Sequence, residues 1–461
     1  MTIEELRESL LMAPKNGYTK ITQEDRVEMN AYAKRYMAYM DECKTEREAT
    51  AWGIREAEKQ GFQPFVPGMS VKAGDKIYYN NRDKALILAV VGSKSLAEGA
   101  NICAAHVDSP RMDLKPNPLY EDSEIAYFKT HYYGGIKKYQ WPTIPLAIHG
   151  IVYRKDGSSV TITIGEKDDD PILMVSDLLP HLGADQFKKT ALEVIGGEQL
   201  NVILGTEPIE GEGSELVKLN IMKWLNDNYG IIENDFQSAE LSIVPAGRCR
   251  EVGFDRSLIS AYGHDDRVCG YAQMEALFTI GTPDKTAVCV LADKEEIGSI
   301  GISGMQSSFF EHLMGGLCDG QGVKLEDCLA NSFCLSADVA NAHDPNFAEV
   351  SERRNTAYLN YGVSICKYTG SRGKGHASDA SAEAMFHVRN TLDKAGVLWQ
   401  IATLGKVDQG GGGTVAAYMA NRNIVTVDAG VPVLSMHAPL ELVSKLDCYM
   451  LLQACKAIYL A

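Results

Sequence analysis

The pattern of hydrophobic and polar positions predicts two helices followed by two buried strands in the first quarter of the chain. Residues 22–60 carry apolar side chains at helical spacing, with a break near Lys44 and a stop at Gly61. Residues 85–91 and 101–106 are apolar runs of strand length. The second run ends in polar residues, and the carboxyl ends of strands are where open α/β sheets place their sites.

The pattern changes after Pro110. Residues 115–143 are rich in Tyr, Gly and Pro, and the alternation of strand and helix is lost. Regular elements are predicted as strands at residues 146–154, 158–164 and 240–244 and as a helix at residues 214–226. We therefore expect an inserted β-rich domain at residues 111–250.

Helical and strand-like segments alternate again from Arg267 to the C-terminus. They lie at residues 267–280, 286–291, 306–314, 332–336, 362–366, 378–395, 398–403, 424–427 and 439–460. Ser378 or Asp379 is expected to cap one of these helices, and Gly396 to end it. This alternation predicts an α/β fold, with a mixed β-sheet flanked by helices, formed by residues 1–110 and 251–461.

The charge and composition of the chain indicate which kinds of partner it does not bind. The chain has 461 residues, 45 Lys and Arg against 61 Asp and Glu, and a net charge of −16, which argues against nucleic acid and against an anionic membrane surface. No apolar run approaches the roughly 20 residues that span a bilayer, and the first residues lack the pattern of a secretory signal. The 11 Cys residues include no Cys-x-x-Cys pair. We expect a cytoplasmic protein with structural cysteines.

Five polar clusters interrupt the apolar framework, and four of them directly follow a strand-like run. They are His106-Val-Asp108, Asp265-Asp-Arg, Asp293-Lys-Glu295-Glu296, Ser336-Ala-Asp338 and Ser435-Met-His437. Any one of them is more often a solvated turn or a hydrogen-bonded His than a site. Several carboxylates at the edge of a core repel one another unless a cation compensates them, and imidazole with carboxylate is a typical ligand set for divalent metals.

These clusters, in this order, resemble the motifs of the aspartyl aminopeptidase and vacuolar aminopeptidase I family, the eighteenth metallopeptidase family. The matching motifs are His106-x-Asp108-Ser-Pro, Asp265-Asp-Arg, Glu295-Glu296-Ile-Gly-Ser, Ser336-Ala-Asp338-x-x-Asn-Ala and Ser435-Met-His437. The resemblance implies a two-metal aminopeptidase, a peptide hydrolase whose catalytic domain is residues 1–110 and 251–461. It also implies that residues 111–250 form a dimerisation domain and that subunits assemble into a tetrahedral dodecamer.

The resemblance also implies a role for each site residue. His106 and Asp338 would hold one metal ion, Glu296 and His437 the other, and Asp265 would bridge the two. Glu295 would be the general base, and Asp108 would orient His106, as ligating His residues require. The adjacent Glu295 and Glu296, at the end of a strand, are expected to project in different directions.

The chemistry of such a pair can be stated from the residue types. Two ions about 3.5–4 Å apart would acidify a shared water and polarise the scissile carbonyl, while Glu295 takes the proton of the water and returns it to the leaving amine. The free α-amine of the substrate is a further possible ligand, which would select peptide N-termini. Zinc is the expected ion, with cobalt or manganese as alternatives, because His and carboxylate bind all three.

One residue of the inserted domain is identified through the resemblance alone. His149, in Ile144-Pro-Leu-Ala-Ile-His149, matches a family His that reaches from the dimerisation domain into the active site of the neighbouring subunit. Without the resemblance, its alternating context is that of an ordinary strand residue.

The substrate pocket departs from the family pattern, so the chain resembles a bacterial-type member with a divergent pocket. In place of a Lys followed by Gln-Arg-Tyr-Ala, the chain has a longer segment whose candidate substrate-binding residues are Lys367, Arg372, Lys374 and His376. The run Gly410 to Gly413 replaces another family segment. A preference for acidic N-terminal residues therefore stays open.

Two other functions remain open at this point. A metal-dependent deacylase or carboxypeptidase could use nearly the same ligands on a related fold. An assembly protein with a vestigial site is disfavoured, because all five ligands and the Glu295 base are present. The Gly410 to Gly413 run lacks the Gly-Lys-Ser/Thr of a phosphate-binding loop, and no Gly-x-Ser-x-Gly nucleophile motif occurs.

Overall fold

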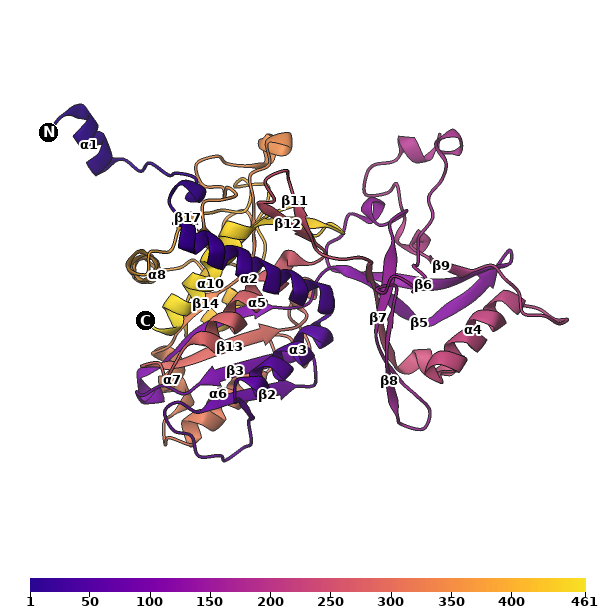
Figure 1. Ribbon diagram of the computed structural model, residues 1–461, viewed down its shortest axis with the longest axis horizontal. Coiled ribbons are helices and arrows are strands. Elements are labelled where there is room, and N and C mark those ends of the chain that lie inside the picture. The colour runs from indigo at the N-terminus through magenta and orange to yellow at the C-terminus, as the bar shows by residue number, and fades with distance from the viewer.

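The computed structural model describes residues 1–461, which form a larger and a smaller lobe (Figure 1). The larger lobe is built on a nine-stranded mixed sheet. Its strands, in spatial order, are β1 (Gln63–Pro64), β2 (Lys76–Asn81), β3 (Ala85–Val90), β13 (Thr286–Ala292), β4 (Ala100–His106), β14 (Phe333–Ser336), β18 (Val425–Gly430), β16 (Val363–Cys366) and β17 (Trp399–Ile401). The four strands β13, β4, β14 and β18 run parallel, so their carboxyl ends meet at one edge.

Helices cover both faces of this sheet, as the strand and helix alternation predicts. One face packs against α2 (Gln23–Glu42), α3 (Glu46–Lys59), α5 (His264–Thr279), α8 (Ala382–Lys394) and α10 (Lys445–Tyr459). The other packs against α6 (Phe309–Asp319), α7 (Leu325–Ala330) and α9 (Val415–Asn421). Alternate residues of β4 enter the two cores, with Cys103 on one side and Ile102 on the other. The mixed α/β fold is therefore confirmed.

The first two long helices form because each has its own amino-terminal cap. Thr22 caps α2 and Thr45 caps α3. The hydroxyl of each Thr accepts a hydrogen bond from the backbone N–H of an acidic residue three positions on, and the carboxylate of that residue accepts the backbone N–H of the Thr. This reciprocal cap explains the break near Lys44. The short helix α1 (Ile3–Leu10) extends away from the body and has no buried residue (Figure 1).

The smaller lobe is a six-stranded antiparallel sheet with its own core of 22 buried residues. Its strands, in spatial order, are β8 (Ser159–Ile164), β7 (Leu146–Tyr153), β10 (Ala239–Pro245), β5 (Arg111–Asp122), β6 (Ile125–Tyr133) and β9 (Val202–Gly205). The helix α4 (Leu216–Tyr229) packs against this sheet. The chain enters the lobe at β5 and leaves it after β10, and the expected domain limits of 111 and 250 stay a prediction.

A third sheet was not predicted. It contains β11 (Arg250–Val252), β12 (Leu258–Ala261), β20 (Glu441–Ser444), β19 (Pro432–Leu434) and β15 (Ala340–Asn341). Residues 439–460 are therefore a short strand followed by α10, where the sequence pattern suggested one element. Likewise, Ser381 caps α8 in place of Ser378 or Asp379.

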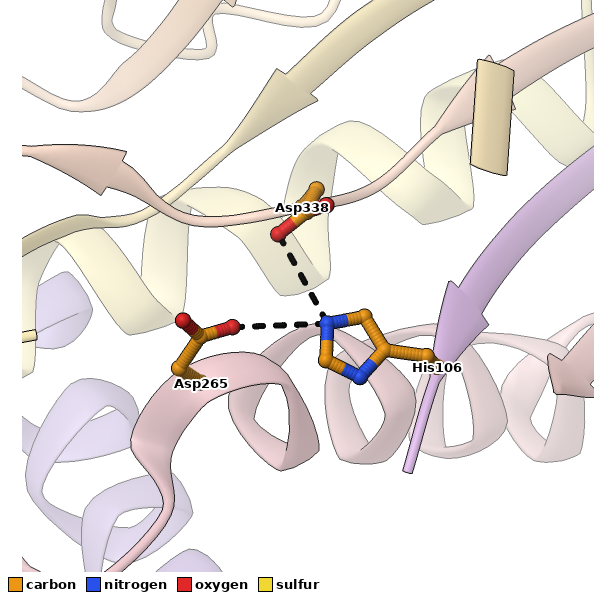
Figure 2. A group of neighbouring side chains, drawn as sticks. All are labelled: His106, Asp265 and Asp338. Carbon is orange, nitrogen blue, oxygen red and sulfur yellow. Dashed lines mark ion pairs between the residues drawn. The ribbon is translucent and has the colours of Figure 1, made fainter. Parts of the chain in front are cut away.

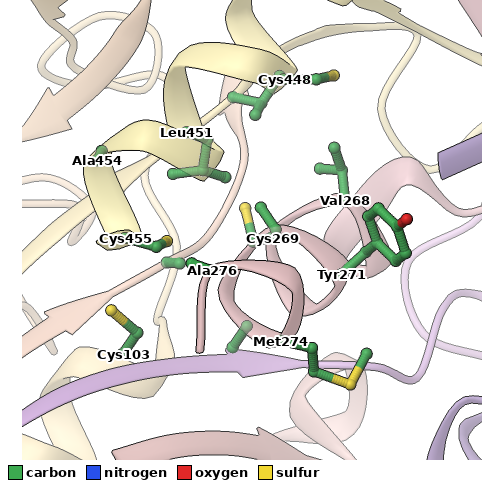
Figure 3. Packing of buried hydrophobic residues seen from close by; sticks show 14 of the residues in the cluster. Cys103, Val268, Cys269, Tyr271, Met274, Ala276, Cys448, Leu451, Ala454 and Cys455 are labelled. Carbon is green, nitrogen blue, oxygen red and sulfur yellow. The ribbon is translucent and has the colours of Figure 1, made fainter. Parts of the chain in front are cut away.

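The helices α5 and α10 pack closely over β4 (Figure 3). Small side chains lie at this contact, including Cys103, Cys269, Ala276 and Cys455. Close packing of this kind fixes α5 against the sheet, and with it the residues at the amino end of that helix. All 11 Cys side chains are buried and unpaired, as expected of structural cysteines. None of the helices combines the length and the apolar character needed to cross a membrane.

Candidate metal centre

Five segments far apart in the sequence meet at the carboxyl edge of the parallel strands. His106 ends β4, and its register partner Ala292 ends β13. Asp338 lies two residues beyond β14, and Asp265 lies in the first turn of α5. His437 follows β19 of the small third sheet.

Glu295 and Glu296 lie in a short 3-10 turn, Glu295–Ile297, beyond β13. The cluster follows the strand, as expected, and the two Glu residues lie in a turn that begins three residues beyond the end of β13. Lys294, which precedes them, has a positive φ of 67° and turns the chain back toward His106.

His106 faces two carboxylates (Figure 2). Its Nε2 atom lies 3.4 Å from Asp265 Oδ1 and 3.9 Å from Asp338 Oδ1. Glu295 Oε2 lies 3.8 Å from the same nitrogen. The side chains of His106 and Asp265 are at most 4% exposed to solvent, and those of Asp338 and Glu295 are 12% and 17% exposed. The group is therefore a largely buried cluster of one imidazole and three carboxylates.

His437 forms the second half of the cluster. Its Nε2 atom lies 3.1 Å from Asp265 Oδ2 and 3.5 Å from Glu296 Oε1. Asp265 thus directs one carboxylate oxygen to each histidine. Asp265 lies close enough to His106 and Asp338, and also to Glu296 and His437, for each of these groups to be able to hold a metal ion. A third such group consists of His106, Glu295 and Glu296.

The electrostatics of the cluster favour a bound cation. Burial raises the pKa of Asp338, with Asp266 adding to it, and burial also raises the pKa of Glu296, with Asp265 adding to it. Burial, opposed by His106 and reinforced by Asp108, raises the pKa of Glu295 to about 7. These shifts report that the negative charges lack compensation from the protein.

Asp265 is the exception among these acids. Burial would raise its pKa, but hydrogen bonds with His106 and His437 outweigh that effect, so the pKa lies below its ordinary value. Glu296 Oε1 is buried and accepts no hydrogen bond. A buried carboxylate oxygen without a hydrogen bond, beside imidazole nitrogens, is a typical ligand for a divalent metal ion. The residues of the cluster therefore fit such an ion.

The other nitrogen of each histidine is held by a main-chain carbonyl. His106 Nδ1 lies 3.0 Å from the carbonyl oxygen of Asp108, and His437 Nδ1 lies 2.9 Å from that of Gly135. Such contacts place the proton on Nδ1 and leave Nε2 for a metal. The Asp108 carboxylate also lies 3.4 Å from His106 Nδ1.

The sequence did not identify three residues that support these ligands. Tyr133 donates a hydrogen bond of 2.8 Å to Asp108 Oδ2. Glu441 accepts hydrogen bonds from the backbone N–H groups of His437, at 2.6 Å, and Asp265, at 3.0 Å. A charged residue inside an apolar run four positions after His437 was the available signal for Glu441; Tyr133 and Gly135 had none.

His149 lies apart from this cluster in its own subunit. The imidazole is buried, with Nδ1 2.7 Å from Glu48 Oε1 and Nε2 2.9 Å from Glu166 Oε1. Burial would lower its pKa, but hydrogen bonds with Glu166 and Glu48 outweigh burial and raise it. Its expected role in the neighbouring active site stays a prediction.

The four candidate substrate-binding residues lie between β16 and α8, and no hydrogen bond or ion pair joins them to the cluster. Lys367 and Lys374 both pair with Asp379 of the same loop. Arg372 and His376 form no ion pair, and both have positive φ angles. Their assignment to the substrate pocket stays a prediction.

The sequence profile described as "Aminopeptidase I zinc metalloprotease (M18)" matches residues 39–459. The chain belongs to the M18 aminopeptidase family. The M18 protein of Clostridium acetobutylicum called probable M18 family aminopeptidase 1 is 49% identical over 449 residues, which cover 95% of this chain and 97% of that one. This M18 chain is accordingly a peptidase, and the resemblance deduced from the motifs is confirmed.

Solved structures agree with the sequence relatives. The crystal structure of the M18 family aminopeptidase from Thermotoga maritima has a TM-score of 0.93 at 43% identity, and the match covers 97% of this chain and 99% of that one. A structure described as a dodecamer of yeast aminopeptidase 1 has a TM-score of 0.76 at 20% identity, covering 93% of this chain and 96% of that one. At that identity the likeness shows the M18 fold alone.

Proposed function

We propose that this M18 enzyme removes N-terminal residues from peptides with two divalent metal ions, zinc being the expected one. His106 and Asp338 would hold one ion, Glu296 and His437 would hold the other, and Asp265 would contribute to both. The observation that carries the proposal is the division of Asp265, whose Oδ1 faces His106 while Oδ2 faces His437. A carboxylate in that position is the usual bridge of a two-metal hydrolase.

Ions in this ligand set supply Lewis acidity, which polarises a scissile carbonyl and acidifies water. The position of Glu295 Oε2, 3.8 Å from His106 Nε2, supports the role of general base for this residue. Glu295 could also join His106 and Glu296 around an ion, and we assign it the role of base because the other five side chains already provide ligands for two ions. Glu295 takes the proton of the attacking water at Oε2 and returns it to the leaving amine. Asp108 holds His106 and the backbone of Glu295 in place.

The same site favours peptide N-termini over internal bonds. A free α-amine is a nitrogen donor of the kind this ligand set accepts, and an acylated amine is not. Substrates with a blocked amine therefore bind without that contact. This difference separates an aminopeptidase from a deacylase that uses similar ligands.

The test is a hydrolysis profile of the full-length protein. Chelated protein is supplied with zinc, cobalt or manganese in turn and assayed on amino-acid anilides with different N-terminal residues, beside their N-acetyl forms. We expect no activity after chelation, recovery with at least one ion, and cleavage of the free-amine substrates alone. Equal cleavage of the N-acetyl forms, or full activity in protein shown to be free of metal, would contradict the proposal.

We further propose that the smaller lobe is a dimerisation domain and that dimers assemble further, up to a tetrahedral dodecamer. The dodecamer of the yeast relative supports this. So do large apolar side chains left exposed on the lobe, among them Leu178, Leu182, Phe187 and Leu192. Native mass spectrometry of the purified protein measures the assembly, and a stable monomer at micromolar concentration would contradict it.

A further inference from the structure

Tyr133, the last residue of β6, and the two glycines that follow it lie against both halves of the proposed metal centre, although β6 belongs to the sheet of the smaller lobe. We call residues 133–135 the brace segment. The hydroxyl of Tyr133 donates to Asp108 Oδ2 at 2.8 Å, beside His106. The carbonyl oxygen of Gly135 lies 2.9 Å from His437 Nδ1, on the other side. One short segment therefore contacts Asp108, which supports His106, and contacts His437 directly.

Asp108 transmits the first of these contacts to the active-site turn. Its Oδ1 accepts the backbone N–H of Glu295 at 3.1 Å, and its Oδ2 accepts that of Glu296 at 3.2 Å. The carboxylate is fully buried. Tyr133 is the only side-chain hydroxyl that donates to it, so this hydroxyl fixes the orientation of the carboxylate together with the two backbone N–H groups.

The Tyr133 ring is itself held rigidly. The guanidinium carbon of Arg111 lies 4.2 Å from the centre of the ring. Arg111 is buried and paired with Glu46 of α3, at 3.0 Å, and with Asp113, at 2.8 Å. A ring stacked on a fixed guanidinium presents its hydroxyl in one place, as a supporting residue must.

The two glycines of the brace segment allow this close approach. Gly134 has a φ of 74°, and a Cβ atom there would lie 3.2 Å from Glu296 Oε2. A Cβ atom on Gly135 would lie 3.3 Å from His437 Nδ1. Side chains at these positions would press on two of the assigned metal ligands, so the backbone lies as near to them as it can.

We infer that Tyr133 is a positioning residue of the metal centre, which acts through Asp108 on His106 and on the turn that carries Glu295 and Glu296. The inference rests on the metal-ligand assignment proposed above. It makes the smaller lobe a structural part of the active site of its own subunit. Tyr133 does not touch the reacting atoms and is not a catalytic residue.

The test compares Tyr133→Phe with Tyr132→Phe in the full-length protein. Tyr132 is on the same strand, is 42% exposed, and its hydroxyl forms no hydrogen bond with the protein, so it is a matched control. In Tyr133→Phe the ring and its contact with Arg111 remain. We expect kcat to fall about 10- to 100-fold, the range usual for residues that support metal ligands, with KM changed much less. The unfolding midpoint should stay near that of the wild type.

Two further readouts distinguish positioning from a general structural effect. The visible absorption spectrum of the cobalt-substituted protein should change in Tyr133→Phe and not in Tyr132→Phe. Asp108→Asn should also lower kcat, and adding Tyr133→Phe to it should lower kcat little further, because the two residues act through one contact. Unchanged kcat and spectrum in Tyr133→Phe, or fully additive effects in the double variant, would overturn the inference.

The ligand assignment is tested separately with Asp265→Asn and His437→Ala. If these variants lose metal and activity while Tyr133→Phe behaves as the wild type, the inference alone fails. If they keep both metal and activity, the proposed metal centre fails, and the inference fails with it.

Discussion

Glu295 and Glu296 are neighbours in the chain, yet their side chains serve different halves of the site. Glu296 Oε1 lies 3.5 Å from His437 Nε2, whereas Glu295 Oε2 lies 3.8 Å from His106 Nε2. Both backbone N–H groups donate to the carboxylate of Asp108. In the proposed assignment, Glu296 would bind metal while Glu295 would accept a proton.

The first prediction concerns this division of roles. Glu295→Gln should keep bound metal and lower kcat by about 10²- to 10⁴-fold, because the amide cannot accept the proton of the water. Glu296→Gln is the matched control, one residue away, and should lose metal. Metal content by elemental analysis and kcat on the preferred anilide measure both effects. Loss of metal from Glu295→Gln with retention in Glu296→Gln would show that the roles are exchanged.

Much of the cluster could be predicted at the residue scale, and the reason is local. His106, Asp265, Glu296, Asp338 and His437 each stand in a short motif beside an apolar run, so chain order alone groups them. Tyr133 and Gly135 could not be found this way. Their contacts cross between two sheets, and nothing in the spacing of a Tyr-rich segment specifies which hydroxyl meets a carboxylate.

At the scale of elements, the strand β18 determines where Asp338 lies. A Cβ atom on Gly430, at the end of β18, would lie 1.8 Å from the carbonyl oxygen of Asp338 and 2.5 Å from its carbonyl carbon. Those are backbone atoms, which cannot rotate away as a side chain could. The loop after β14 can therefore bring Asp338 to the cluster with His106 only because β18 ends in glycine.

The second prediction follows from this contact. Gly430→Ala should displace Asp338 and lower both metal affinity and kcat by at least about tenfold. Gly281→Ala is the control, since a Cβ atom there would meet nothing within 4 Å, and it should match the wild type. Metal titration monitored by activity and direct metal analysis measure the change. Normal metal affinity in Gly430→Ala would mean that the loop absorbs the added methyl group.

Elements of helical length and continuous apolar strands were predicted from the sequence, whereas the third sheet was not. Its strands have two to four residues, which is too short for a periodic pattern to appear. They also pair over long separations, as β12 does with β20. The same reason explains why residues 439–460 look like one element: a four-residue strand leads directly into α10 without a turn signal.

At the scale of the whole molecule, metal binding should contribute to stability as well as to catalysis. Buried acids without a counter-ion destabilise the folded state, and an ion that binds only that state stabilises it by about 2.7 kcal/mol at a hundred times its Kd. Chelation should therefore lower the thermal unfolding midpoint of the wild type and of Glu295→Gln, which retains the ligands. Glu296→Gln should respond less. An unchanged midpoint in protein shown to have lost its metal would contradict this prediction.

His149 connects the two lobes, and this position gives it two competing roles. In its own subunit the imidazole lies between Glu48 of α3 and Glu166 of the smaller lobe. Lys44, two residues before the start of α3, also pairs with Glu166 at 2.6 Å. His149 could therefore act only as a clamp between the lobes, or it could complete the active site of a neighbouring subunit, as the family resemblance implies.

The two roles differ in whether one subunit can rescue another. His149→Ala should remain assembled and lose most activity, and Glu295→Gln should be inactive for its own reason. If His149 acts in the neighbouring subunit, co-expressing the two variants creates some sites in which one subunit supplies Glu295 and its neighbour supplies His149. Such sites make up about a quarter of the total when subunits mix at random. Activity should then return to about that fraction of the wild type. If His149 acts only as a clamp within its own chain, we expect no recovery, because no subunit of the mixture contains both residues. Near-normal turnover of His149→Ala alone would exclude the catalytic role altogether.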